Sequence, residues 1–238
     1  MTSLPSLLDR PILFAHRGAR AHAPENTITA FELGLRLGAT GLESDAWLTA
    51  DGVVVLDHDG RVRVGRRRRL IAGCSREQLP PHIPTLVELY AACGTAAHLS
   101  LDVKDPAAFD PIVDVARAAG DEALSRLWLC HPDFDTLVGW REQCPTVRLV
   151  NSTRLRSLPL GAERRAAELA EARIDAINLH HSDWSGGLTT LFHRFERLTF
   201  GWDAQHERVL QGLLRMGIDG VYSDWVERMI DAMRVKES

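Results

Sequence analysis

Eight short apolar runs of β-forming residues alternate with stretches long enough for helices, and this alternation constrains the fold more than any other feature of the chain. Strands that alternate with helices indicate βα units around a parallel sheet, and eight such units are typical of a (β/α)8 TIM barrel. We therefore predict one α/β barrel domain over residues 1–238. The predicted strands are Pro11–Ala15, Gly41–Trp47, His98–Val103, Arg126–Cys130, Val147–Val150, Ala176–Leu179, Leu198–Trp202 and Gly220–Ser223. The predicted helices are Thr27–Leu37, Pro106–Ala119, Gly161–Ala172, Ala204–Met216 and Trp225–Met233.

Polar side chains stand at or just beyond the carboxyl ends of these predicted strands. This end of the strands carries the chemistry in (β/α)8 barrels. A polar residue can also simply mark where a buried strand stops, but that explanation accounts poorly for the whole set. The residues are His16, Asp45, Asp102 with Lys104, His131, Asn151, His180, Trp202 and Asp224.

A hairpin is expected directly after the second strand, because Asp51-Gly52 lies between valine-rich segments. A two-residue turn would pair Ala50 with Val53, and counting back along both strands would place Asp45 opposite His58. Directly opposed residues have Cβ atoms about 5 Å apart. The sequence thus predicts that Asp45 and His58 lie together on one face.

Histidine and arginine at these positions suit the cleavage of a phosphodiester. The reaction needs a proton taken from the attacking oxygen and a proton given to the leaving oxygen, and His16 and His58 can divide this work near neutral pH. The guanidinium of Arg17 offers a planar fork of donors to a phosphate. Each of these residues alone is equally compatible with a structural or surface role, so the hypothesis depends on their combination.

Two carboxylates interrupt the second predicted strand at Glu43 and Asp45, two residues apart and therefore on the same face. Burying them is costly unless a cation compensates their charge. Carboxylate oxygens without thiolates favour Mg²⁺ or Ca²⁺ over zinc. A solvated strand edge is the alternative explanation.

The order of the motifs resembles the glycerophosphodiester phosphodiesterase family, and the resemblance extends over nearly the whole chain. The matching segments are His16-Arg17-Gly18, Pro24-Glu25-Asn26-Thr27, Glu43-Ser44-Asp45, Thr49 to Val55 around Asp51-Gly52, His58-Asp59, Ile83-Pro84-Thr85-Leu86, Asp102-Val103-Lys104, Gly217-Ile218-Asp219-Gly220 and Ser223-Asp224. Ile83 to Leu86 is the start of a helix in that family. Pro24 to Thr27 is also read here as a helix start, with Asn26 as its cap.

The resemblance implies the hydrolysis of a glycerophosphodiester to an alcohol and glycerol 3-phosphate, with the glycerol hydroxyl attacking first to form a cyclic phosphate. It implies that His16 and His58 form the acid/base pair. The other implied roles are phosphate binding by Arg17 and Lys104 and binding of Mg²⁺ or Ca²⁺ by Glu43, Asp45 and Asp102. Trp202 either packs against the glycerol or caps the barrel.

Two departures from the family bear on metal and substrate. Asp102 stands where most members have glutamate, so the third carboxylate is one methylene shorter. The family insertion after the second strand is short here and carries a basic run, Arg61–Arg69, in place of the usual segment. A short insertion should leave the mouth of the site open, and the arginines either attract anionic substrates or form a solvated basic loop.

Composition limits the partners. The net charge of −4 gives no overall field that attracts nucleic acid or an anionic membrane. The four cysteines lack a Cys-x-x-Cys spacing, which favours reduced thiols and a cytoplasmic location. Neither a signal peptide nor a membrane span is expected. The oligomeric state is left open.

Two other functions remain as alternatives. The first is a lysophospholipase-D-like activity on lipid phosphodiesters, which contain the same bond. The second, of a different class, is a barrel without catalytic activity that binds phosphate or nucleic acid through Arg66–Arg69.

Overall fold

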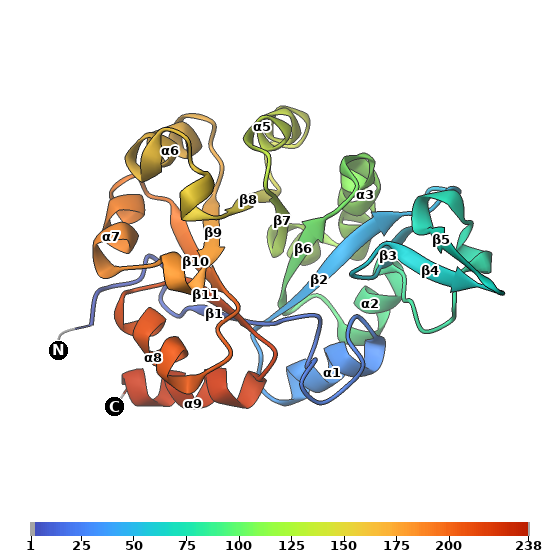
Figure 1. Ribbon diagram of the computed structural model, residues 1–238, viewed down its shortest axis with the longest axis horizontal. Coiled ribbons are helices and arrows are strands. Elements are labelled where there is room, and N and C mark those ends of the chain that lie inside the picture. The colour runs from blue at the N-terminus through green and yellow to red at the C-terminus, as the bar shows by residue number, and fades with distance from the viewer. Residues whose placement is uncertain (1–2, 238) are drawn as a thin grey trace.

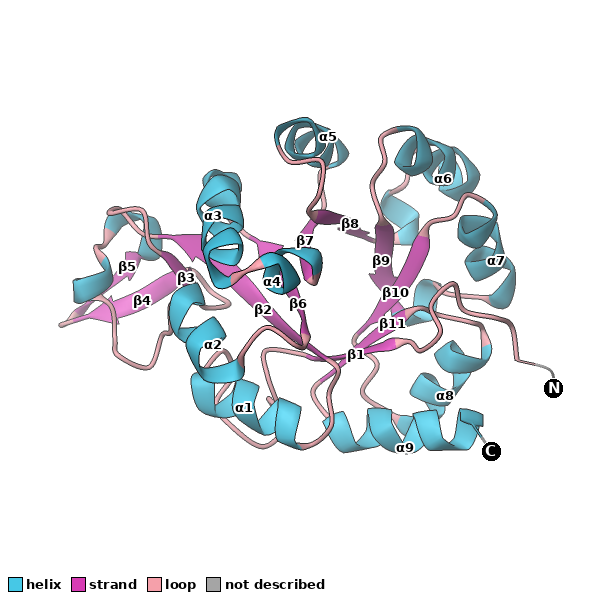
Figure 2. Ribbon diagram, turned by 180° about the vertical axis from the view of Figure 1, so that it is seen from behind, coloured by secondary structure: helices cyan, strands magenta, loops and turns pink. Residues whose placement is uncertain are grey.

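A computed structural model describes residues 3–237 of the protein, and within this range eight parallel strands form a closed barrel (Figure 1). The ring closes because β1 pairs with both β2 and β11. Helices surround the barrel on the outside (Figure 2). The barrel strands are β1 (Ile12–Ala15), β2 (Gly41–Leu48), β6 (His98–Val103), β7 (Leu127–His131), β8 (Arg148–Thr153), β9 (Ala176–His180), β10 (Leu198–Trp202) and β11 (Gly220–Ser223). The predicted (β/α)8 fold is confirmed, and each predicted strand overlaps one barrel strand.

The helices follow the strands in the expected alternation. They are α1 (Ile28–Arg36), α2 (Leu86–Cys93), α3 (Phe109–Ala119), α4 (Asp121–Ser125), α5 (Phe134–Gln143), α6 (Gly161–Glu171), α7 (Gly186–Arg194), α8 (Glu207–Arg215) and α9 (Val226–Glu237). The five predicted helices correspond to α1, α3, α6, α8 and α9, while α4, α5 and α7 were not predicted. The cap of α1 was predicted wrongly: Thr27, not Asn26, accepts the N–H of Ala30.

The hairpin after β2 has a different register from the predicted one. Ala46 pairs with Leu56 across β2 and β3 (Val54–Leu56), so Asp45 lies opposite Asp57 and not opposite His58. The cause is a turn of three residues, which is closed by Thr49 and Val53. The N–H of Thr49 donates to the carbonyl of Val53, and the hydroxyl of Thr49 accepts the N–H of Val53. The predicted pairing of Asp45 with His58 is therefore wrong.

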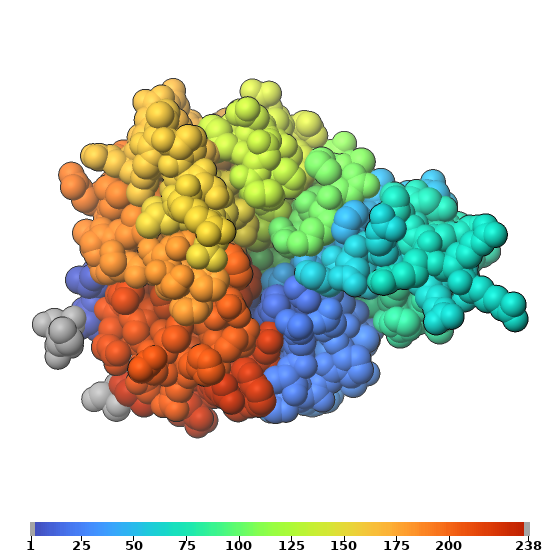
Figure 3. Space-filling view, viewed as in Figure 1, coloured from blue at the N-terminus to red at the C-terminus, as the bar shows by residue number. Residues whose placement is uncertain are grey.

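The short insertion forms a second, two-stranded sheet beside the barrel. Strands β4 (Arg61–Val64) and β5 (Arg67–Leu70) pair antiparallel and project from the edge of the molecule (Figure 3). Arg63 and Arg68 lie directly opposite each other, and all four residues of β5 are exposed. The basic run is thus a projecting hairpin and not part of the barrel core.

Aromatic side chains fill the interior of the barrel. The ring of Phe14 stacks on Tyr222 at 4.5 Å and meets Phe200 edge-on at 5.7 Å, and Trp128 meets Phe200 at 5.1 Å. The hydroxyl of Tyr222 hydrogen-bonds to Ser100 at 3.0 Å. These buried rings fill the barrel interior between its strands.

The four cysteines are free thiols. None of the helices in the described part of the chain combines the length and the apolar character that a membrane span requires. The cytoplasmic location stays a prediction.

Asp219 is a buried carboxylate that joins four parts of the barrel. It accepts hydrogen bonds from Ser6, from the N–H of Leu7, from His193 and from both the N–H and the hydroxyl of Thr199, at 2.7 to 2.9 Å. Burial opposes ionisation, but the bonds from His193, Ser6 and Thr199 outweigh it and hold the pKa of Asp219 below its usual value. Asp219 therefore contributes stability as an ionised group.

Asp219→Ala is expected to lower the free energy of unfolding by about 3–5 kcal/mol, because several buried donors lose their acceptor. Urea denaturation measures this, with exposed Asp114→Ala as the control, for which about 0–1 kcal/mol is expected. The carboxylate is protonated less readily in the folded protein, so its contribution is present above about pH 4 and is lost as the pH falls through the folded pKa. An equal loss in both variants would contradict the role of Asp219.

Candidate active site

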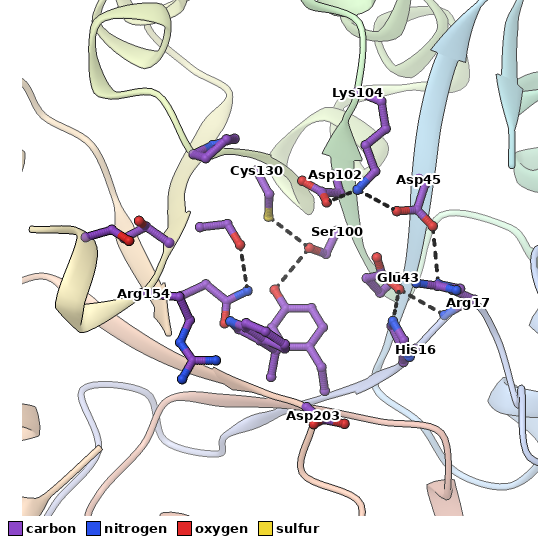
Figure 4. A pocket seen from close by; sticks show the side chains of 17 residues that line it. His16, Arg17, Glu43, Asp45, Ser100, Asp102, Lys104, Cys130, Arg154 and Asp203 are labelled. Carbon is purple, nitrogen blue, oxygen red and sulfur yellow. Dashed lines mark hydrogen bonds and ion pairs between the residues drawn. The ribbon is translucent and has the colours of Figure 1, made fainter. Parts of the chain in front are cut away.

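A cavity of about 480 Å³ opens at the carboxyl ends of the barrel strands (Figure 4). This size is within the range of small-molecule sites. The predicted residues at strand ends supply much of its wall. The lining residues are His16, Arg17, Glu43, Asp45, Ser100, Asp102, Lys104, Cys130, Pro132, Ser152, Thr153, Arg154, Ser157, Asn178, Trp202, Asp203 and Tyr222.

His16 follows β1 directly and is held on both sides by carboxylates. Its Nδ1 lies 2.6 Å from Oδ1 of Asp224, and its Nε2 lies 3.8 Å from Oε2 of Glu43. Burial opposes the imidazolium form, but the charge of Glu43 and the hydrogen bond with Asp224 outweigh it and raise the pKa of His16. His16 is therefore an oriented imidazole whose second nitrogen is directed at the acidic wall of the cavity.

Arg17 bends the chain sharply into the site. Its φ of 51° is unusual for a residue with a side chain, and its backbone N–H donates to Glu43 at 2.9 Å. The guanidinium pairs with Glu25 at 3.1 Å and with Asp45 at 3.4 Å. Gly18 follows with a φ of 77°, and a Cβ there would lie 2.5 Å from the carbonyl carbon of Ala30, so only glycine fits. The turn fixes the position of the arginine.

The three predicted metal ligands lie on one wall, on adjacent strands. The register of β2 and β6 places Asp45 beside Asp102, with Glu43 two residues earlier on the same face. The ammonium of Lys104 lies between two of them, 3.0 Å from Asp45 and 2.5 Å from Asp102. Burial opposes the charge of Lys104, but these two carboxylates raise its pKa.

The ionised form of Glu43 is disfavoured in this wall. Its pKa is raised to about 7, mainly by burial and also by the charges of Asp45 and Asp102, which together outweigh the opposing effects of His16 and the N–H of Arg17. A divalent cation would relieve this repulsion, and carboxylate oxygens are suitable ligands for Mg²⁺ or Ca²⁺. The donor set thus fits a hard cation, although the oxygens of the three carboxylates do not all lie within 4.8 Å of one another.

His58 is not among the residues that line the cavity. It lies in the loop after β3, its side chain is 40% exposed, and its Nδ1 is 2.9 Å from Asp59. The hydrogen bond from His58 is the main cause of the lowered pKa of Asp59, and the charge of Arg17 also contributes, which places this loop within electrostatic reach of the site. The structure therefore brings His16, but not His58, into contact with the carboxylates.

Trp202 lines the same cavity, in which Arg154 and Asp203 lie across from the carboxylate wall (Figure 4). The guanidinium of Arg154 lies over the Trp202 ring at 5.6 Å and pairs with Asp183 at 2.9 Å. His180 meets the same ring edge-on at 4.6 Å. The expectation that Trp202 reaches the site is consistent with this position.

Several residues that shape the site were not predicted to belong to it. Asp224 orients His16, and Glu25 holds Arg17. Asn26, expected as a helix cap, instead donates from Nδ2 to Asp45 at 3.3 Å and accepts from Ser44 at 2.7 Å. Asp224 lies just after the last strand, which is a signal in the sequence, but its partner His16 directly follows the first strand, 208 residues earlier.

Comparisons with known proteins agree with this geometry. Residues 16–82 match the model of the glycerophosphoryl diester phosphodiesterase family. YhdW of Bacillus subtilis (strain 168), whose name assigns it provisionally to this activity, is 25% identical over an alignment of 235 residues that covers 92% of this chain and 96% of YhdW.

Solved structures share the fold. A glycerophosphodiester phosphodiesterase from Thermotoga maritima has a TM-score of 0.79 at 22% identity, with 97% of this chain and all of that chain covered. A phosphodiesterase from Oleispira antarctica, solved in complex with the product sn-glycerol-3-phosphate, also has a TM-score of 0.79, at 21% identity, with 94% and 97% covered.

Proposed function

Since this chain belongs to the glycerophosphodiester phosphodiesterase family, we propose that it hydrolyses glycerophosphodiesters to an alcohol and glycerol 3-phosphate in this cavity. The observation that carries the proposal is the arrangement around His16. An imidazole oriented by Asp224 shares one cavity with Arg17, Lys104 and a carboxylate wall. The product complex of the Oleispira antarctica phosphodiesterase supports the substrate class.

His16 exchanges a proton with the substrate through Nε2, while Asp224 fixes the ring through Nδ1. The glycerol hydroxyl gives up its proton and attacks the phosphorus, the bond from phosphorus to the alcohol oxygen breaks, and the leaving alkoxide takes a proton from an acid. Water then opens the resulting cyclic phosphate to glycerol 3-phosphate. We assign the second proton transfer to His58, which approaches the substrate from the loop after β3. Its support is that Asp57, the residue before His58, donates its backbone N–H to the carbonyl of Asp45 at 3.0 Å, which joins this loop to the carboxylate wall.

Arg17 and Lys104 bind the non-bridging oxygens of the phosphate. Both cations line the cavity, and both are held by carboxylates that fix where their donors point. Charge-assisted bonds of this type strengthen as negative charge develops in the transition state. Trp202 supplies an apolar surface for the glycerol or the alcohol on the opposite wall.

Glu43, Asp45 and Asp102 would hold a divalent cation, Mg²⁺ or Ca²⁺, which would supply positive charge to neutralise the phosphate. Asp102 is the most exposed of the three, with a side chain 32% accessible, and it is one methylene shorter than the glutamate usual in the family.

The decisive experiment is turnover of a panel of glycerophosphodiesters with different alcohols, with and without a chelator, followed by release of glycerol 3-phosphate. Turnover that stops on chelation and returns with Mg²⁺ or Ca²⁺ is expected. An acyl-bearing lysophospholipid in the same panel tests the lysophospholipase-D-like alternative. A protein that only binds phosphate or nucleic acid would show no turnover, and its binding would fall steeply with salt, survive chelation and be unaffected by His16→Ala.

Asp102→Asn is expected to weaken cation binding by ~10- to 100-fold and to lower turnover at limiting cation, because one anionic ligand is lost. Turnover measured over a Mg²⁺ titration checks this. Asp105→Asn is the control, since Asp105 caps the turn after β6, accepting the N–H of Ala107, and asparagine caps equally well. Identical titrations for Asp102→Asn and the wild type would remove Asp102 from the metal site.

The assignment of His58 predicts a two-limbed dependence of kcat on pH, one limb for each histidine. His58→Gln is expected to abolish one limb, whereas His82→Gln, an exposed histidine outside the cavity, should leave both. A profile that His58→Gln leaves unchanged would show that another group carries the second proton.

A further inference from the structure

A second group of possible metal ligands lies across the cavity from the carboxylate wall. His180 ends β9, His181 begins the short 3-10 helix His181–Asp183, and Asp203 follows β10. The strands are neighbours, with His180 paired to Trp202. Within the described part of the chain, only here do three such side chains bring ligand atoms within 4.8 Å of one another.

The contacts within this His-His-Asp group already have the form of a binding site. Nε2 of His180 lies 3.2 Å from Oδ2 of Asp203, and the two imidazole rings are 4.3 Å apart. Asp203 has a φ of 60°, an unfavourable conformation for a residue other than glycine, and Gln205 donates to its other oxygen at 3.3 Å. Strained backbone of this kind concentrates at functional sites.

The ring of His180 is held in place by its neighbours on both sides, Asp203 and Trp202. His180 packs edge-on against Trp202 at 4.6 Å, so its ring has a defined orientation.

Binding through Nε2 of His180 requires the imidazole proton to stand on Nδ1. The hydroxyl of Ser182 lies 2.8 Å from Nδ1 and can accept that proton. In that tautomer the N–H of Ser182, which donates to Nδ1 at 3.2 Å in the structure, loses this acceptor. The imidazole proton of His180 thus moves from Nε2 to Nδ1. A metal-bound histidine is usually supported by such a hydrogen bond from the ring nitrogen that does not bind the metal.

We propose that His180, His181 and Asp203 bind a transition-metal cation of the Zn²⁺ class at the rim of the cavity. Two imidazoles and one carboxylate prefer such ions over Mg²⁺ and Ca²⁺. Asp203 is 49% exposed and also lines the cavity, so the remaining coordination positions face water and any bound phosphodiester. On this proposal the cavity binds a hard cation at the carboxylate wall that contains Asp45 and a softer cation at the His-His-Asp group that contains Asp203.

The test uses Co²⁺ as a coloured substitute for Zn²⁺, added to the full chain in excess Mg²⁺, which competes for the carboxylate wall. One equivalent of Co²⁺ is expected to produce a visible absorption band, and Zn²⁺ should remove it. His181→Gln and Asp203→Asn should each weaken Co²⁺ binding by ~10- to 100-fold or more. Asparagine tolerates the positive φ of position 203, so this variant keeps the backbone.

His206→Ala is the matched control, because His206 lies near His181 but outside the ligand group. It should bind Co²⁺ as the wild type does, and so should Asp45→Asn. The proposal is overturned if the band is absent, if it is not stoichiometric, or if it persists in His181→Gln and disappears in Asp45→Asn. The readout is metal binding, so its failure is independent of whether the protein cleaves phosphodiesters.

Discussion

His16→Ala is expected to lower kcat for a glycerophosphodiester by ~10²- to 10⁴-fold, the usual range for loss of a general acid or base. Only Nε2 of His16 is available to the cavity, because Nδ1 is bonded to Asp224 at 2.6 Å. Initial rates at saturating substrate and cation measure the effect. KM should change little, since Arg17 and Lys104 still bind the phosphate.

The control for this prediction is His82→Ala, which removes an exposed histidine outside the cavity and should retain full activity. Asp224→Asn adds a second measurement. It removes a hydrogen bond and a charge that raise the pKa of His16, so an NMR titration should find that pKa lower in Asp224→Asn than in the wild type. Full turnover by folded His16→Ala would exclude His16 from proton transfer.

The barrel strands were predictable because strands buried on both faces need nearly continuous apolar sequence, which stands out between polar helices. Two of the helices that were not predicted lack an equally clear pattern of helix-forming residues. Helix α5 contains Gly139, and α7 begins with Gly186 and Gly187, residues that disfavour helices. Their caps, Asp133 and Ser185, are recognisable only once the helices are known.

The hairpin register failed for a local reason. Asp51-Gly52 predicts a tight turn equally well for a loop of two residues or of three. The choice is made by Thr49, whose hydroxyl bonds to Asp51 at 2.6 Å and accepts the N–H of Val53, which extends the loop by one residue. A shift of one residue moves each side chain to the other face of a strand, so His58 loses the predicted contact with Asp45.

The sequence predicted those parts of the site that depend only on which strands are adjacent in the barrel. Glu43, Asp45 and Asp102 are placed by adjacent strands, and their residue types indicate a cation. The bond between His16 and Asp224 depends on closure of the barrel, which joins its first and last strands. The position of Lys104 between two carboxylates depends on side-chain conformation, about which sequence spacing gives no information.

Asp45→Asn is expected to cause the largest loss on the carboxylate wall, with turnover lowered by ~10²- to 10³-fold and cation affinity by ~10- to 100-fold. Asp45 is 2% exposed and contacts Lys104, Arg17 and Asn26, so it positions both proposed phosphate ligands as well as belonging to the proposed metal site. Asparagine keeps the shape of the side chain but removes its charge. Turnover over a Mg²⁺ titration separates the two effects. Excess cation can restore the occupancy of a weakened metal site, but it cannot restore the placement of Arg17 and Lys104.

Asp45→Asn is expected to affect the stability of the folded protein much less than it affects turnover. Asp45 repels Glu43 and Asp102, and its charge is one cause of the raised pKa of Glu43, so Asp45→Asn relieves repulsion while it weakens two ion pairs. The thermal midpoint of Asp45→Asn should therefore change far less than that of Asp219→Ala, because Asp219→Ala removes hydrogen bonds without relieving any comparable repulsion. A folded Asp45→Asn protein with wild-type turnover at every cation concentration would contradict a role for Asp45 in metal and phosphate binding, and would transfer that role to Glu43 and Asp102 alone.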